Sequence, residues 1–145
     1  MQTQTGPARP RAYRWVAILA LAWNLVGLAM SLAQGTMDEA RLATLAEADR
    51  QVYLATPPWV NLAFAFAVIG GVLGALCLLL RLRWAVPMFA VSLLALVVQF
   101  AGAYLVTPAW QAYGAAGLAM PVLLLVVALA LLAYARRARA GGWLR

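Results

Sequence analysis

The chain has 145 residues, of which 66% are hydrophobic and 10% are charged, and its mean hydropathy is +0.87. Because a soluble domain is about half apolar and about a quarter charged, this composition excludes a water-soluble globule, and it excludes a disordered chain as well. All 11 basic residues are arginine, against 4 acidic residues, no histidine and one cysteine. That inventory excludes histidine acid–base chemistry, an intrachain disulfide and most metal sites.

Four uncharged apolar stretches are long enough to cross a bilayer core of about 30 Å. In lipid, each backbone N–H and C=O has to be paired within its own segment, so the stretches are predicted to be helices. We therefore expect an all-α integral membrane four-helix bundle that forms a single domain over residues 1–145. The predicted spans cover residues 15–33, 59–80, 85–105 and 116–135.

The arginines indicate the orientation of the bundle. Nine of them precede the first span, separate the second from the third, or follow the fourth, and no acidic residue lies among them. The loop between the first and second spans holds the other two arginines and all four acidic residues. Under the positive-inside rule, both termini are predicted to be cytoplasmic.

The first span has an alternative interpretation as a cleaved signal peptide. Arginines precede its apolar run, and Ser31-Leu32-Ala33 follows it in the manner of a cleavage site. The run is longer than the usual apolar region of about 7–15 residues, and it carries Trp23 and Asn24 at its middle. We favour an uncleaved anchor; cleavage would leave three spans.

Two polar segments flank the first span. Residues 1–12 are predicted to form a flexible tail whose arginines lie on anionic headgroups. The loop over residues 34–58 is predicted to hold one or two short amphipathic helices. Thr36 and Glu39 have the spacing of a capping box, with Thr36 as the N-cap, and Pro57 and Pro58 are expected to end the helical pattern.

Small residues predict the helix contacts, because helices in lipid associate through close packing. The first three spans carry such residues at alternating spacings of four and three, which keeps them on one helix face. The predicted packing positions are Gly27, Gly70, Gly74 and Gly102.

Four polar residues in these stripes are the candidates for binding a neutral polar solute: Asn24, Ser31, Ser92 and Gln99. Amides and hydroxyls offer both donors and acceptors, which suits sugar hydroxyls. Asn24 lies about 14 Å along its helix from Trp15, near mid-membrane and level with Gly70 and Gly71, whereas Gln99 is about 22 Å from Trp84. The two amides are therefore expected not to touch. The alternative role for all four is interhelical hydrogen bonding.

The spans contain no acidic or basic residue that would mark a proton or ion pathway. Cys77 lies in an apolar run and is predicted to be an inert thiol. No nucleophile–base pair, phosphate loop or metal-ligand spacing is present. We therefore expect a protein that is not an enzyme and that has no cofactor, no metal and no nucleic-acid partner.

Several segments together resemble a known family. They are Trp23-Asn24-Leu25-Val26-Gly27, residues 45–53, Thr56-Pro57-Pro58-Trp59, Gly70-Gly71-x-x-Gly74, residues 83–93, and residues 135–145. They resemble an uncharacterised proteobacterial family of small four-helix inner-membrane proteins that often carry the label "sugar transporter". The resemblance covers nearly the whole chain. It implies a multi-pass protein of the bacterial inner (plasma) membrane.

Two functional hypotheses follow from these observations. The first is a transporter, or a transporter subunit, for a sugar or another neutral polar solute. Four short helices leave little room for a cavity, so a pathway is expected to form between copies in a homo-oligomer. The alternative is a non-catalytic accessory or assembly protein that binds a larger membrane protein partner.

Overall fold

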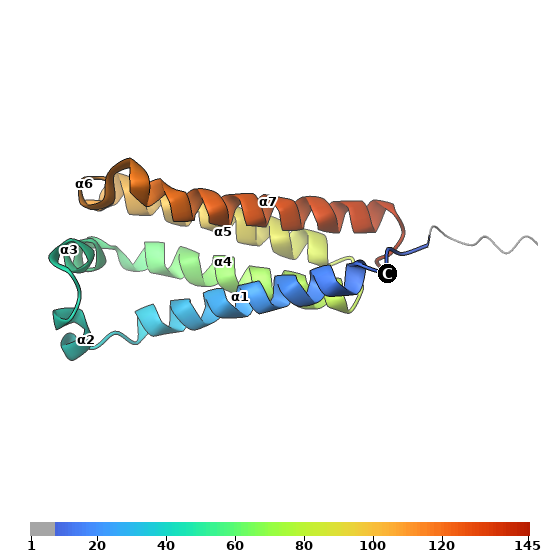
Figure 1. Cartoon of the computed structure of the whole chain (residues 1–145), viewed down its shortest axis with the longest axis horizontal. Coiled ribbons are helices and arrows are strands. Elements are labelled where there is room, and N and C mark those ends of the chain that lie inside the picture. Colours follow the sequence, from blue (N-terminus) through green and yellow to red (C-terminus); the bar gives the residue numbers. More distant parts are fainter. Residues whose placement is uncertain (1–7) are drawn as a thin grey trace, which may run out of the picture.

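The computed structural model describes residues 8–145, so most of the tail predicted over residues 1–12 lies outside the described residues. Within the described part, every regular element is a helix, as Figure 1 shows. The elements are α1 (Tyr13–Gly35), α2 (Glu39–Ala43), α3 (Glu47–Ala55), α4 (Pro58–Leu79), α5 (Ala85–Val106), α6 (Ala109–Tyr113), the 3-10 helix η1 (Gly114–Leu118) and α7 (Ala119–Ala140).

Helices α1, α4, α5 and α7 each have 22 or 23 residues. At 1.5 Å per residue they are about 33 Å long, which matches a hydrocarbon core of about 30 Å. All four are long and apolar enough to cross a membrane, and the fourth candidate span begins at Ala109, ahead of α7 itself. The predicted all-α four-helix membrane bundle is therefore confirmed.

The long helices pack in the order α1, α4, α5, α7 (Figure 1). Helices α4 and α5 form the central pair, joined by a short turn that contains Arg81 and Arg83. Helix α1 packs on α4, and α7 packs on α5. The C-terminus lies at the end of the bundle where α1 begins, which we call the arginine-rich end (Figure 1).

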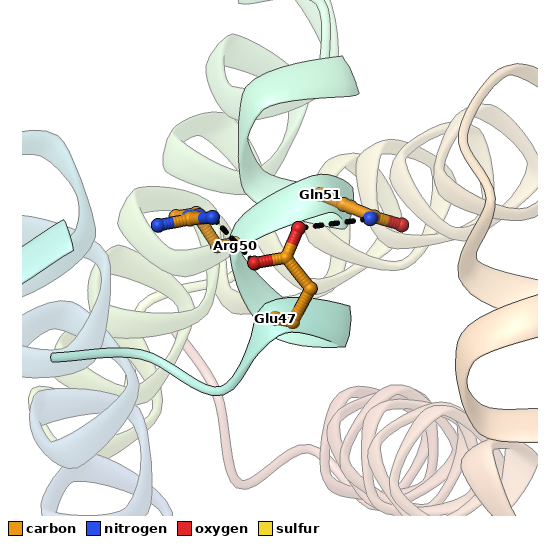
Figure 2. A network of polar contacts seen from close by, with 3 residues as sticks. All are labelled: Glu47, Arg50 and Gln51. Carbon is orange, nitrogen blue, oxygen red and sulfur yellow. Dashed lines mark hydrogen bonds and ion pairs between the residues drawn. The ribbon is translucent and has the colours of Figure 1, made fainter. Parts of the chain in front are cut away.

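The opposite end, which carries all four acidic residues, is called the acidic end and holds the short helices α2, α3 and α6 (Figure 1). Two tyrosine hydroxyls connect α3 to its neighbours. Tyr53 of α3 donates to the backbone oxygen of Gln34 in α1, and Tyr113 of α6 donates to Asp49 Oδ1 of α3 over 2.6 Å. Within α3, Glu47 accepts from Arg50 as an ion pair and from Gln51 Nε2 over 2.9 Å (Figure 2). Such pairs three and four residues apart support a short helix.

The predicted capping box is wrong. Asp38, not Thr36, is the N-cap of α2, because its Oδ1 accepts a hydrogen bond of 2.8 Å from the Arg41 backbone N–H. Thr36 instead follows the end of α1, and its hydroxyl donates to the Leu32 carbonyl. Helix α1 continues to Gly35, which places Thr36 at its end. Asp38 is the next residue able to cap a helix, and α2 begins after it. Helix α3 ends at Ala55, and Pro58 opens α4, where its missing N–H costs nothing.

Large apolar side chains cover the outside of the long helices and stay exposed, as Leu19, Leu94 and Leu105 do. Exposing this much apolar surface to water would be strongly unfavourable. These faces therefore contact the lipid of the bilayer. Trp15 and Trp84, at the arginine-rich end, are 68% and 67% exposed. Flat amphipathic rings at this level suit the membrane interface.

The buried core lies at the arginine-rich end, and Tyr13 is at its centre. Tyr13 is only 1% exposed, its hydroxyl donates to the Leu78 carbonyl, and its ring lies 6.1 Å from the rings of both Tyr134 and Trp143. Tyr13 thereby joins the first turn of α1 to the ends of α4 and α7 and to the C-terminal segment. The other buried members of the core are Ala17, Ala20, Ala75, Leu78, Ala85, Phe89, Leu132, Ala135, Ala138 and Leu144.

Candidate functional site

A groove with a cavity volume of about 290 Å³ lies between α1 and α7, with α4 and α5 as its floor. Its α1 wall extends from Trp23 to Gln34, and its α7 wall extends from Met120 to Leu131. Each wall covers twelve residues, whose ends are about 16 Å apart along the helix. Helices α1 and α7 run in opposite directions along the bundle. The two walls therefore lie over the same half of it, from the middle to the acidic end.

The groove exists because α1 and α7 do not pack on one another along this half. Towards the arginine-rich end, the buried core fills the space between them. Towards the acidic end, Gly27 on α1 has only ordinary contact with Val68 on α4, since a β-carbon there would lie 3.8 Å from the valine. Val26, Met30 and Met120 line the groove and are themselves more than half exposed, so its mouth faces the lipid.

The walls and floor of the groove are mainly apolar. Phe64, Phe89 and Leu96 lie on the floor side, and the α7 wall is built of methionine, leucine, valine and alanine. Among residues 8–145, no acidic or basic side chain lines it. In a low-dielectric site of this kind an ionised ligand would be left unpaired, so the groove suits an uncharged occupant.

Asn24, Ser92 and Gln34 are the polar residues of the lining, and the first two meet beside Gly71 of α4. A β-carbon at Gly71 would lie 1.9 Å from Asn24 Oδ1 of α1 and 3.4 Å from Ser92 Oγ of α5. The Asn24 carboxamide and the Ser92 hydroxyl therefore approach the same point of the α4 backbone. Both residues also line the groove.

Each of these two side chains is held by one hydrogen bond. Asn24 Nδ2 donates to the Ala20 carbonyl one turn earlier over 2.8 Å, and Ser92 Oγ donates across to the Ala67 carbonyl of α4. Within residues 8–145, the carboxamide oxygen of Asn24 accepts no hydrogen bond. Asn24 thus keeps one acceptor and a second N–H, and Ser92 keeps its lone pairs.

The structure brings Asn24 and Ser92 together and leaves the other two predicted solute-binding residues apart from them. Ser31 lies on α1 outside the lining of the groove, and Gln99 is also absent from that lining. Gln99 stands on α5 between Ser92 and Gly102, both of which contact α4, and its Oε1 is buried without a hydrogen-bond partner among the described residues.

The four predicted packing glycines have different surroundings. A β-carbon at Gly70 would come within 3.2 Å of the Met88 and Ser92 backbone, and one at Gly74 would come within 2.8 Å of the Phe89 ring. At Gly102 it would lie 2.5 Å from the Trp59 ring. These three therefore set the close approach of α4 and α5, whereas Gly27 faces only ordinary contact.

Gly71, beside the groove, is the packing position that the sequence stripe did not select. Adjacent glycines on a helix point about 100° apart, so Gly70 faces α5 while Gly71 faces α1. Two adjacent glycines place a small residue on each of two helix faces. The pair Gly70-Gly71 is therefore the sequence signal for a helix that packs closely on both sides.

No family model, no curated protein and no solved structure matches the chain. The geometry itself defines a small multi-pass membrane protein of four apolar helices with a lateral groove.

Proposed function

We propose that the chain is a non-catalytic membrane protein that holds the apolar chain of a lipid in the groove between α1 and α7. The observation that carries this proposal is the match in length. The groove walls extend about 16 Å, and one leaflet of a bilayer core measures about half of 30 Å. A partner transmembrane helix would cross both halves of the membrane, but the buried core occupies the second half.

The composition of the groove supports the same occupant. An acyl or isoprenoid chain gains from burial against leucine, valine and methionine through close packing, and it demands no hydrogen bonds. It also reaches a mouth that faces the lipid without leaving the membrane. In this proposal the Ser92 hydroxyl joins α5 to α4, and Asn24 packs against Gly71 of α4, at the inner end of the groove.

The experiment compares the lipids that stay bound when the protein is purified in a mild detergent. Native mass spectrometry is expected to show a retained lipid on the wild type and a loss of that lipid in Gly27→Leu, whose side chain enters the groove. Ala22→Leu is the matched control, because Ala22 lies on the same helix, exposed and outside the lining. Equal lipid retention in all three proteins would refute the proposal, and a co-purifying protein lost in Gly27→Leu would favour the accessory role.

The second candidate is transport of a neutral polar solute such as a sugar, as the sequence resemblance implies. It is favoured by one observation: the free donor and acceptor of Asn24 lie beside Ser92 at the inner end of the groove. Asn24→Leu and Ser92→Ala would then abolish a thermal shift produced by a sugar panel. If no sugar shifts the melting temperature of the wild type, this candidate fails and the lipid proposal is unaffected.

For either function we propose the bacterial inner membrane, with the arginine-rich end in the cytoplasm. The support is the charge distribution, since nine arginines lie at one end and the four acidic residues lie at the other. Reporter fusions at Arg145 would test the orientation.

A further inference from the structure

Two helix ends meet at the arginine-rich end and are joined by backbone hydrogen bonds. The Arg145 N–H donates to the Arg81 carbonyl over 2.6 Å, and the Arg83 N–H donates to the Arg145 carbonyl over 3.0 Å. Arg145 is thereby held beside the turn between α4 and α5. We call this arrangement of Arg81, Arg83 and Arg145 the arginine clasp.

The buried side chain next to the clasp holds it in place. Leu144 is 3% exposed and belongs to the same core as Tyr13, while Trp143 packs edge-on against the Tyr13 ring. The backbone of the clasp is therefore anchored on one side by the core. Hydrogen bonds and packing therefore set the backbone positions of its three arginines, from which the long side chains extend.

Arg81 adopts a backbone conformation that favours glycine. Its φ is +62°, and it is the only residue other than glycine with a positive φ in the described chain. It follows Leu80, the C-cap of α4, and the next N–H, that of Leu82, donates back to the Cys77 carbonyl over 2.7 Å. Glycine is the usual residue at this position of such a helix end. An arginine in a strained backbone conformation that glycine would adopt without strain suggests that the positive charge at this position is functional.

Within residues 8–145, no acidic side chain pairs with the arginines of the clasp. All four acidic residues lie at the acidic end, and within residues 8–145 Arg50 is the only arginine whose guanidinium forms an ion pair or hydrogen bond (Figure 2). Three arginines whose backbones are held together, with no acidic side chain beside them among the described residues, attract an anion from outside, and guanidinium groups match the oxygens of a phosphate.

The neighbours of the clasp identify the source of the phosphate. Leu80, Leu82 and Trp84 alternate with the two arginines of the turn and are exposed. Apolar side chains beside cations fit a molecule with both acyl chains and a phosphate, at the level where a helix leaves the bilayer. We propose that the arginine clasp binds the headgroup phosphate of an anionic phospholipid.

The test uses the full chain in a neutral detergent and adds phosphatidylglycerol or phosphatidylcholine. Phosphatidylglycerol is expected to raise the melting temperature of the wild type, and phosphatidylcholine is expected to raise it much less. In the triple variant Arg81→Gln, Arg83→Gln, Arg145→Gln the affinity for phosphatidylglycerol is expected to fall about tenfold or more. Inorganic phosphate alone should give no shift, because it brings no acyl chain.

The matched control is the triple variant Arg11→Gln, Arg14→Gln, Arg139→Gln, which removes the same charge from the same end of the bundle. It is expected to keep most of the shift. Equal loss in both triple variants would mean diffuse attraction and would overturn the site, as would a full shift with inorganic phosphate. Should the clasp triple fail to fold, Arg81→Gly replaces it. Glycine removes the backbone strain at position 81, so Arg81→Gly is expected to raise the melting temperature in neutral detergent. It is also expected to reduce the increase in melting temperature that phosphatidylglycerol produces. An unchanged increase would contradict the proposal.

Discussion

Asn24 Oδ1 lies 1.9 Å from the point that a β-carbon on Gly71 would occupy. The Asn24 carboxamide can keep this position only while residue 71 has no side chain. We expect Gly71→Ala to displace the Asn24 carboxamide and to lower the free energy of unfolding by about 1–2 kcal/mol. Thermal unfolding in detergent measures the loss.

The double variant Asn24→Ala, Gly71→Ala tests whether the two residues act through each other. Alanine at position 24 removes the oxygen that the new methyl group meets, so the double variant is expected to be more stable than Gly71→Ala alone. Gly35→Ala is the control, since nothing lies within 4 Å of its β-carbon position. Purely additive losses would show that the contact does not limit the packing.

The Ser92 hydroxyl is expected to make a small contribution to stability. It donates to the Ala67 carbonyl between α5 and α4, and interhelical hydrogen bonds in membranes average about 0.6 kcal/mol. Ser92→Ala should therefore lower the free energy of unfolding by about that amount, while Ser31→Ala, without such a bond, should leave it unchanged. An equal effect of the two substitutions, measured by unfolding in detergent, would contradict the assigned role of the hydrogen bond.

Tyr13 is expected to be the most sensitive position at the arginine-rich end, because it joins α1, α4, α7 and the C-terminal segment. Tyr13→Phe removes the hydrogen bond to the Leu78 carbonyl and should cost about 1 kcal/mol. Tyr13→Ala also leaves a cavity in the core and should cost about 3–5 kcal/mol. The control is Tyr53→Phe, whose hydroxyl bonds at the exposed surface. A Tyr13→Ala protein as stable as the wild type would refute this account of the core.

The long helices could be predicted from the sequence because lipid leaves the backbone only one way to pair its polar groups. Which of these helices pack against one another could not be predicted in the same way. In a soluble helix an apolar stripe marks the buried face, but α4 and α5 are apolar all round, since both protein and lipid accept leucine. Only small residues carry directional information there, and they identified Gly70 and Gly74 while leaving Gly71 unassigned.

The candidate site was predictable in part for the same reason. Asn24 and Ser92 stand out as polar residues within apolar spans, and both line the groove. The groove itself depends on where α1 and α7 diverge, and no local pattern encodes that. The N-cap of α2 was missed because Thr36 and Asp38 are both good capping residues, and the length of α1 decides between them.

The end of α7 provides a prediction about the C-terminal segment. Gly142 has a φ of +69°, and the following N–H, that of Trp143, donates to the Ala138 carbonyl over 2.9 Å. A side chain at this φ costs about 1–2 kcal/mol, so Gly142→Ala is expected to loosen the segment that places Leu144 in the core. Faster tryptic cleavage after Arg139 and a lower melting temperature would both follow. Gly35→Ala, at an open position without a positive φ, should change neither. If Gly142→Ala resists trypsin as well as the wild type does, the C-terminal segment is not held by this turn.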